Sequence, residues 1–464
     1  MKTCAVVLAA GLGKRMKSAT PKVVHNLMGK PIVTYSVEAV KAVAGVLKVV
    51  LVIGRHSEQQ LRGIFKADPM VSFAFQTSLL GTADALKSGI GGLNGEEFDY
   101  TLVMTADAPL IRGETLQGLI DRHIQGGNAV TVLSFVSKDP SSYGRIIRNP
   151  YGTIKGIIEN PDATQEQRKI NEVNSGIYVF SKDALPLLDK IQVNAKKGEF
   201  YLTDIVSIAS ENGLKVEAQK MFDEDEFIGI NSRTELLAAL NALKRRVNRH
   251  WMDEGVTLMD ENTTLICPDV SIGRDTIIYP NVIIEGKTVI GEGCVIYPNV
   301  RIVDSTIERD VVVKDSTLIE SATIQSGAAV GPFAHLRPGA AIGKKAKVGN
   351  FVEIKNSTLG YNTKASHLSY IGDAAVGDNV NIGAGTITCN YDGVNKFKTV
   401  IEDNVFIGSD SQLVAPVTIG KGAFVGAGST ITQDVPVNAL AISRVRQRAI
   451  LDWVKAKFTK DKHK

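Results

Sequence analysis

The stretch from Ile272 to Ile302 reads IGRDTIIYPNVIIEGKTVIGEGCVIYPNVRI and places an isoleucine at every sixth position. The same spacing of aliphatic residues recurs from Ile324 to Ile354 and from Ile401 to Ile431. A period of six matches neither the 3.6-residue turn of an α-helix nor the two-residue alternation of a strand. It is typical of hexapeptide repeats, in which each repeat forms one side of a triangular coil. The C-terminal half is therefore predicted to be a parallel β-helix with these side chains pointing inward.

The hexapeptide pattern is broken most clearly between Ile382 and Ile401. Residues 390–398, NYDGVNKFK, do not fit a six-residue rung, so we expect a loop that leaves the prism. Breaks in a regular pattern are where function is expected. His367 precedes this break, and imidazole suits a general base near neutral pH. It is the preferred candidate, although a purely structural histidine fits the spacing as well.

The N-terminal half alternates apolar runs with amphipathic stretches. Strands are predicted near 6–10, 49–53 and 100–104, and helices near 33–44 and 57–65. This alternation predicts an α/β Rossmann-like domain, with a mostly parallel sheet covered on both faces. Ligands of such sheets bind beyond the carboxyl ends of the strands.

Two loops at those ends contain residues suited to binding phosphate groups and Mg²⁺. The first, LAAGLGKRM from Leu8 to Met16, offers backbone amides and Arg15, and Lys22 follows shortly after. Amides and fixed cations suit a nucleoside triphosphate, although an ordinary turn with two surface cations is the alternative. In the second, Asp107 directly follows a strand and suits Mg²⁺, or else caps a helix starting near Pro109.

A third candidate is Gln76, followed by Gly81 and Thr82, which is suited to reading a base or ribose edge. Residues 232–254 show helical periodicity and are predicted to be a linker helix, with a nucleic-acid helix as the disfavoured alternative. The chain is thus divided into 1–231, 232–254 and 255–464.

Bulk properties exclude several classes of protein. Over 464 residues, 53 basic and 49 acidic side chains give a net charge of +4, which is too balanced to suggest nucleic acid. The four cysteines form no CxxC pair, so neither a zinc site nor a disulfide framework is expected. No run of 18 apolar residues suggests membrane insertion, and a cytoplasmic protein is expected. The lysines of the C-terminal tail are interpreted as solvated.

The motifs in combination resemble a known family. Five motifs resemble the uridylyltransferase half of the bacterial bifunctional N-acetylglucosamine-1-phosphate uridylyltransferase/glucosamine-1-phosphate acetyltransferase. They are LAAGLGKRM, the PK at 21–22, YGRI at 143–146, NEVNSG at 171–176 and GIN at 229–231. VGNFVEIK at 348–355 and NIGAGTITCNYDG at 381–393 resemble the acetyltransferase half. The resemblance spans nearly the whole chain and implies a left-handed β-helix and a homotrimer.

The resemblance also implies residue roles in the N-terminal half. Arg15 and Lys22 would stabilise the phosphates, while Asp107 and Asn231 would bind Mg²⁺. The residues implied to contact UTP or the UDP-sugar are Leu8, Ala9, Ala10, Gly11, Lys22, Gln76, Gly81, Thr82, Thr105, Ala106, Asp107, Gly144, Glu159, Asn174 and Asn231.

Two positions depart from the family pattern. Ala83 and Asp84 stand where the family commonly has Gly-His, and Ala106 stands where it often has glycine. These departures leave the choice of nucleotide open.

In the C-terminal half, the resemblance implies that His367 is the general base that deprotonates the glucosamine amine. Arg337, Lys355, Tyr370 and Asn381 would hold the acetyl acceptor. Ala384, Asn390, Tyr391, Ser409, Ala427 and Arg444 would line the acetyl-CoA site. A covalent route through Cys389 is disfavoured. The segment from Arg444 to Ile450 is predicted to be helical.

The implied function is acetylation of glucosamine-1-phosphate by acetyl-CoA, followed by transfer of UMP from UTP to give UDP-N-acetylglucosamine, a precursor of peptidoglycan and lipopolysaccharide. One alternative is a nucleotidyltransferase whose β-helix is only regulatory or oligomerising. Another keeps both activities but prefers a different nucleotide or sugar phosphate. A non-enzymatic scaffold is disfavoured, because Arg15, Lys22 and Asp107 are all present.

Overall fold

The computed structural model describes residues 1–458, which excludes Lys460, Lys462 and Lys464 of the basic tail. The chain forms two compact units, residues 1–243 and 244–464. The division falls inside helix α7 (Arg233–Asp253), which matches the helix predicted there. None of the helices in the described part of the chain is both long and apolar enough to span a membrane.

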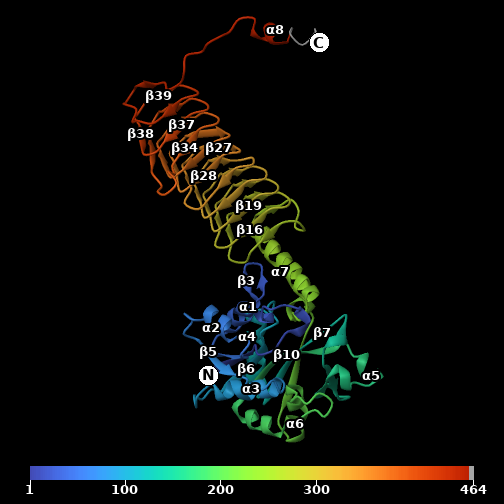
Figure 1. Cartoon of the computed structure of the whole chain (residues 1–464). Helices are drawn as coiled ribbons and strands as arrows, with labels where there is room; N and C mark the ends of the chain where they lie inside the picture. The colour runs from blue at the N-terminus through green and yellow to red at the C-terminus, as the bar shows by residue number, and fades with distance from the viewer. Residues whose placement is uncertain (459–464) are drawn as a thin grey trace. The chain divides into compact units, whose positions relative to one another are not determined.

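The first unit is built on one sheet (Figure 1) with strand order β11-β7-β10-β6-β1-β4-β5. Strand β10 is antiparallel to β6 and β7, and the other neighbours on this path are parallel. The strands are β1 (Thr3–Leu8), β4 (Val46–Ile53), β5 (Val71–Phe75), β6 (Tyr100–Thr105), β7 (Val130–Val136), β10 (Glu172–Ser181) and β11 (Val216–Met221). In addition, β8 (Arg145–Arg148) pairs with β10, and β9 (Ile154–Ile158) pairs with β8. The predicted mostly parallel sheet is confirmed.

Helices cover both faces of this sheet. Because side chains alternate along a strand, Val7 of β1 joins one core and Val6 joins the other. The Val7 core includes apolar residues of α1 (Ile32–Lys41), α2 (Glu58–Ile64) and α4 (Gly113–Gly126). The Val6 core includes residues of α3 (Thr82–Gly91) and α6 (Ile205–Glu211). The unit also has α5 (Gln165–Arg168) and the short hairpin β2 (Asn26–Leu27) with β3 (Lys30–Pro31).

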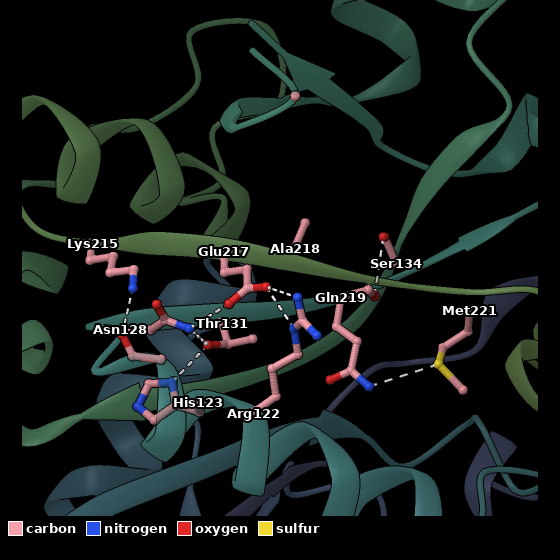
Figure 2. A network of polar contacts seen from close by, with 12 residues as sticks. Arg122, His123, Asn128, Thr131, Ser134, Lys215, Glu217, Ala218, Gln219 and Met221 are labelled. Carbon is pink, nitrogen blue, oxygen red and sulfur yellow. Dashed lines mark hydrogen bonds and ion pairs between the residues drawn. The ribbon is translucent and has the colours of Figure 1, made fainter.

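A partly buried polar network joins the end of α4 to β7 and β11 (Figure 2). His123 is fully buried, and its Nδ1 lies 2.8 Å from Oγ1 of Thr131. Asn128 donates to Thr131 and, at 2.9 Å, to Glu217, which pairs with Arg122. Burial lowers the pKa of His123 from 6.5 to about 4, so its ring is neutral at physiological pH.

The second unit is a stack of triangular coils whose short strands form three parallel sheets (Figure 1). The first face contains β12 (Thr257–Leu258), β15 (Ile277–Ile278), β18 (Val295–Ile296), β21 (Val312–Val313), β24 (Ala329–Val330), β27 (Lys347–Asn350), β30 (Lys364–His367), β33 (Asn381–Ile382), β36 (Phe406–Ile407), β39 (Phe424–Val425) and β41 (Leu440–Ala441). The second face contains β13 (Leu265–Ile266), β16 (Ile283–Glu285), β19 (Arg301–Val303), β22 (Leu318–Glu320), β25 (His335–Leu336), β28 (Glu353–Lys355), β31 (Tyr370–Gly372), β34 (Ile387–Cys389), β37 (Gln412–Val414) and β40 (Thr430–Ile431). The third face contains β14 (Ser271–Ile272), β17 (Val289–Ile290), β20 (Thr306–Ile307), β23 (Thr323–Ile324), β26 (Ala341–Ile342), β29 (Thr358–Leu359), β32 (Ala374–Val376), β35 (Thr399–Ile401) and β38 (Val417–Ile419).

The residues of the six-residue ladders are buried inside this prism, as predicted. Between ladders the interval shortens to five residues, as from Ile302 to the buried Ile307. Thr388 occupies an inward position where the other coils carry aliphatic residues, and its Oγ1 accepts a hydrogen bond from the backbone N–H of Gly372 at 2.8 Å. The predicted loop at 390–398 is confirmed and is closed by an antiparallel bridge between Tyr391 and Lys396.

The prediction of a helix from Arg444 to Ile450 is wrong. These residues form no helix, and α8 (Trp453–Phe458) begins after them. Residues 444–450 are all exposed, so no core stabilises a helix there. A helix of so few residues is unstable in water without tertiary packing.

Candidate functional sites

Parallel strands β6, β1, β4 and β5 are neighbours, so their carboxyl ends meet at one edge of the sheet. The loops that follow them surround a cleft of about 540 Å³. It is lined by Leu8, Ala9, Ala10, Gly11, Leu12, Lys14, Lys22, Val23, Gln76, Leu79, Gly81, Thr82, Ala85, Thr105, Asp107 and Glu199. Most residues predicted to contact the nucleotide therefore lie together in this cleft.

The first loop lies close against Lys22. Gly13 has a φ of 59°, and a Cβ there would be 2.5 Å from the Cβ of Lys22. Both the left-handed conformation and the close approach require glycine. Arg15 is exposed and, among residues 1–458, makes no ion pair, so its charge is available to a ligand.

Lys22 connects the loops at the edge of the sheet. Its Nζ lies 2.5 Å from Oδ2 of Asp107 and 2.9 Å from Oδ1 of Asn231. The backbone N–H of Ile230 donates to the carbonyl of Asp107 at 2.8 Å, which holds Asn231 next to that carboxylate. Residues far apart in the sequence thus converge on one cation.

The electrostatics of Asp107 favour a bound cation. Burial alone would raise the pKa of Asp107. The charge of Lys22 and hydrogen bonds from Lys22 and Thr105 lower this pKa by more than burial raises it, so the net pKa lies below the ordinary value. The Asp107 and Asn231 oxygens already converge on a positive group. Such a set, with a single carboxylate, fits a hard divalent cation that takes its remaining oxygens from phosphates and water. Residues 1–458 contain no cluster of three His, Cys, Asp or Glu residues that could hold a metal alone.

The two departures from the family pattern have different environments. Ala106 is fully buried in the Val7 core and does not line the cleft. The carboxylate of Asp84 accepts a hydrogen bond of 2.8 Å from Nε2 of Gln76, so it acts on the cleft through another side chain.

The three predicted sugar residues lie together beside β10. The backbone N–H of Asn174 donates to the carbonyl of Gly144 at 2.9 Å. A Cβ on Gly144 would be 3.4 Å from Oε1 of Glu159, which also accepts a hydrogen bond from Thr203. Burial raises the pKa of Glu159.

In the second unit, a single corner column carries the predicted base and several coenzyme residues. The register of β27, β30, β33, β36 and β39 aligns Asn350, His367, Ala384, Ser409 and Ala427 on five successive coils, after the first face. The guanidinium of Arg444 donates to the carbonyl of Ala427. His367 is exposed, and its Nδ1 lies 2.6 Å from Oδ1 of Asn350.

Three of the residues predicted to hold the acetyl acceptor, Arg337, Lys355 and Tyr370, lie on the second face or directly after its strands. Arg337 and Lys355 are aligned on successive coils, and Tyr370 lies on the next strand of the same sheet. Arg337 pairs with Glu353 at 2.7 Å. Lys355 lies 3.9 Å from Asp373.

The remaining predicted residues of this site lie elsewhere on the coil. Asn381 begins strand β33 on the first face. Asn390 and Tyr391 lie in the loop after the second face, where Asn390 donates to Asp373 at 2.5 Å. One chain therefore does not bring Asn381 onto the face that carries Arg337. Burial raises the pKa of Cys389, which disfavours a thiolate nucleophile.

The structure adds residues that the sequence reasoning missed. Lys396, in the loop that breaks the repeat, lies near Lys355, whose ammonium lowers the pKa of Lys396. Asn350 belongs to the VGNFVEIK motif but was not among the predicted site residues. Lys14 and Glu199 line the cleft. Lys14 belongs to the loop from Leu8 to Met16, whereas no sequence motif contains Glu199.

Comparison with known families agrees with both units. The Nucleotidyl transferase family matches residues 4–258, and Bacterial transferase hexapeptide (six repeats) matches residues 269–304 and 398–433. The fold and the two sites thus define a nucleotidyl transferase joined to a left-handed β-helix of the hexapeptide transferase type.

Full-length relatives make the assignment specific. Each of the following is named Bifunctional protein GlmU. The protein of Thermodesulfovibrio yellowstonii is 49% identical over 97% of this chain and 99% of its own length. The protein of Heliobacterium modesticaldum is 47% identical over 100% of this chain and 99% of its own length. The protein of Clostridium beijerinckii is 45% identical over 99% of this chain and 100% of its own length. The chain belongs to the bifunctional GlmU family, as the resemblance of its motifs predicted.

Proposed function

We propose that this protein catalyses two successive transfers. The unit 244–464 acetylates the amine of glucosamine-1-phosphate with acetyl-CoA. The unit 1–243 then transfers UMP from UTP to the N-acetylated product, which gives UDP-N-acetylglucosamine and pyrophosphate. The observation that supports the pair most directly is the presence, in one chain, of a Lys22–Asp107–Asn231 cluster at a nucleotide-sized cleft and a base-bearing column on a hexapeptide coil.

For uridylyl transfer, an oxygen of the sugar phosphate attacks the α-phosphorus of UTP and pyrophosphate leaves. The protein supplies alignment and neutralisation of charge, and no side-chain nucleophile is needed. Arg15 and Lys22 bind phosphate oxygens, while Gly144, Glu159 and Asn174 position the sugar.

We assign Mg²⁺ to Asp107 and Asn231, where it would neutralise triphosphate oxygens when bound. Both residues also accept hydrogen bonds from the Lys22 ammonium.

For acetyl transfer, Nε2 of His367 takes a proton from the amine as the amine attacks the thioester carbonyl, and the thiolate of coenzyme A leaves. Arg337, Lys355 and Tyr370 hold the acceptor, with Lys396 as a further cation for its phosphate. Ala384, Ser409, Ala427 and Arg444 form the coenzyme side of the site.

We propose a homotrimer, in which a second copy completes each acetyl-transfer site. The single chain places Asn381 on the first face, whereas Arg337 and Lys355 lie on the second, which supports this arrangement. Three large apolar residues on one corner, Phe333, Phe351 and Leu368, are 52%, 57% and 60% exposed, and each has a positive φ. Bulky residues rarely adopt this conformation, and exposed apolar columns are typical of interfaces.

We also propose a cytoplasmic location, because UTP and acetyl-CoA are cytoplasmic substrates. The product would supply peptidoglycan and lipopolysaccharide precursors.

The two activities can be tested in one assay. Purified protein is supplied with glucosamine-1-phosphate, acetyl-CoA, UTP and Mg²⁺, and free thiol and pyrophosphate are measured separately. We expect both products, with thiol release lost in His367→Ala and pyrophosphate release lost in Asp107→Ala when the acetylated sugar is supplied. Pyrophosphate formation without thiol release under any condition would contradict the acetyltransferase assignment and favour a regulatory β-helix.

A further inference from the structure

The Gln76 side chain is fixed by two acceptors on the α3 side of the cleft. Its Nε2 donates to the carbonyl of Gly81 at 3.0 Å and to Oδ2 of Asp84 at 2.8 Å. A carboxylate and a carbonyl can only accept, so both amide hydrogens of Gln76 are directed away from a ligand. Turning the amide over would place its oxygen against two other acceptors, which is strongly unfavourable.

This orientation decides what Gln76 offers to the cleft. Gln76 is 6% exposed and lines the cleft, and within the described residues its Oε1 has no hydrogen-bond partner. The side chain therefore presents a single acceptor. A pyrimidine whose N3 carries a hydrogen can donate to it, whereas the N3 of cytosine is itself an acceptor and would be repelled.

The Gly81 carbonyl, which accepts one of the two hydrogen bonds from Gln76, is held rigidly. Gly81 has a φ of 110°, and a Cβ there would lie 2.6 Å from the carbonyl oxygen of Phe200. The backbone of Phe200 donates to Leu80 at 2.7 Å and accepts from Ala83 at 3.1 Å. Asp84 follows in the first turn of α3, where a negative charge is favourable. Both acceptors thus belong to fixed backbone elements.

We propose that Asp84 is a positioning residue for base selection: by fixing the Gln76 amide, it selects a nucleotide with an imide edge, as in uracil or thymine, over cytosine. The proposal deepens the uridylyl transfer proposed above and rests on it. It also gives a role to Asp84, which stands where the family commonly has histidine, because the carboxylate of Asp84 orients the amide of Gln76. It assigns no discrimination between uracil and thymine, whose imide edges are the same.

The test compares kcat/KM for UTP, dTTP and CTP by pyrophosphate release with N-acetylglucosamine-1-phosphate. In Asp84→Asn and Asp84→Ala, only the Gly81 carbonyl still holds the Gln76 amide in this orientation. The turned amide is then less unfavourable, so we expect the UTP:CTP ratio to fall about tenfold or more. The UTP:dTTP ratio should stay as in the unmodified protein. Asp84→Glu restores a carboxylate and should recover most of the UTP:CTP ratio.

The matched control is Glu58→Gln, which removes the first-turn acid of α2 without touching the cleft. Thermal unfolding identifies any variant that fails to fold, and Asp84→Ala remains informative because alanine is a good helix former. A UTP:CTP ratio unchanged in both folded variants would overturn the proposal. Failure of the unmodified protein to use UTP would instead overturn the proposed function.

Discussion

The imidazole Nδ1 of His367 donates a hydrogen bond of 2.6 Å to Oδ1 of Asn350, which occupies the same corner one coil earlier. An amide oxygen can only accept, so the proton resides on Nδ1 and Nε2 keeps its lone pair. Asn350 therefore sets the tautomer that a general base needs. Because the amide is neutral, it orients the ring without adding a negative charge beside it.

Replacement of Asn350 should impair acetyl transfer selectively. We expect Asn350→Ala to lower kcat for thiol release by about tenfold or more, part of the roughly 10²–10⁴ contributed by a positioned base. In Asn350→Asp, a carboxylate beside Nδ1 would stabilise the imidazolium, so the acid limb of the pH–rate profile should move to higher pH. Pyrophosphate release is the control. An unmoved acid limb in an active Asn350→Asp variant would contradict the role of Asn350.

The proximity of Lys355 and Lys396 predicts an anion site. Two neighbouring ammonium groups repel each other, and a phosphate between them would relieve that repulsion. We expect Lys396→Met to raise the KM for glucosamine-1-phosphate about tenfold, the size of one charge-assisted hydrogen bond. Lys364→Met, an exposed lysine on β30, is the control for loss of charge. An equal KM in both variants would remove Lys396 from the acceptor site.

The exposed apolar residues Phe333, Phe351 and Leu368, which lie on one corner of the coil, predict an interface. Leu368→Asp should abolish assembly and thiol release, measured by light scattering and by the acetyl-transfer assay, while pyrophosphate release persists. Aspartate tolerates a positive φ better than leucine, so the coil itself should remain folded. Val289→Asp, on the third face, is the control. A Leu368→Asp protein that kept its assembly mass would place the interface elsewhere.

The buried His123 predicts acid sensitivity of the first unit. An unfolded histidine takes up a proton below pH 6.5, but the folded His123 does so only below about pH 4. Between these values the unfolded state binds more protons, so the free energy of unfolding falls as pH decreases, by up to about 3 kcal/mol in total. This contribution is fully present above pH 6.5.

Calorimetric melting at pH 7 and pH 5 measures this effect. The decrease in melting temperature should be smaller in His123→Leu than in the unmodified protein, and unchanged in His56→Gln, whose ring is exposed. Equal decreases in all three proteins would show that His123 does not carry the acid sensitivity.

Several parts of the molecule could be predicted from local sequence. The ladder from Ile272 to Ile302 predicted the coil, because a six-residue repeat matches one face of the prism, and residues 390–398 predicted the loop by interrupting it. The prediction of a helix from Arg444 to Ile450 was wrong, because a short exposed segment does not form a stable helix without a surface to pack against.

The sequence by itself determined the two architectures, the phosphate loop and the family, because each depends on residues close together along the chain. Only the tertiary structure decided which distant residues meet: Asn231 with Lys22 and Asp107, Asn350 with His367, and Asp84 with Gln76. These contacts depend on strand order, coil register and the conformation of Gly81. Packing and backbone geometry fix such features, and no local pattern of residues encodes them.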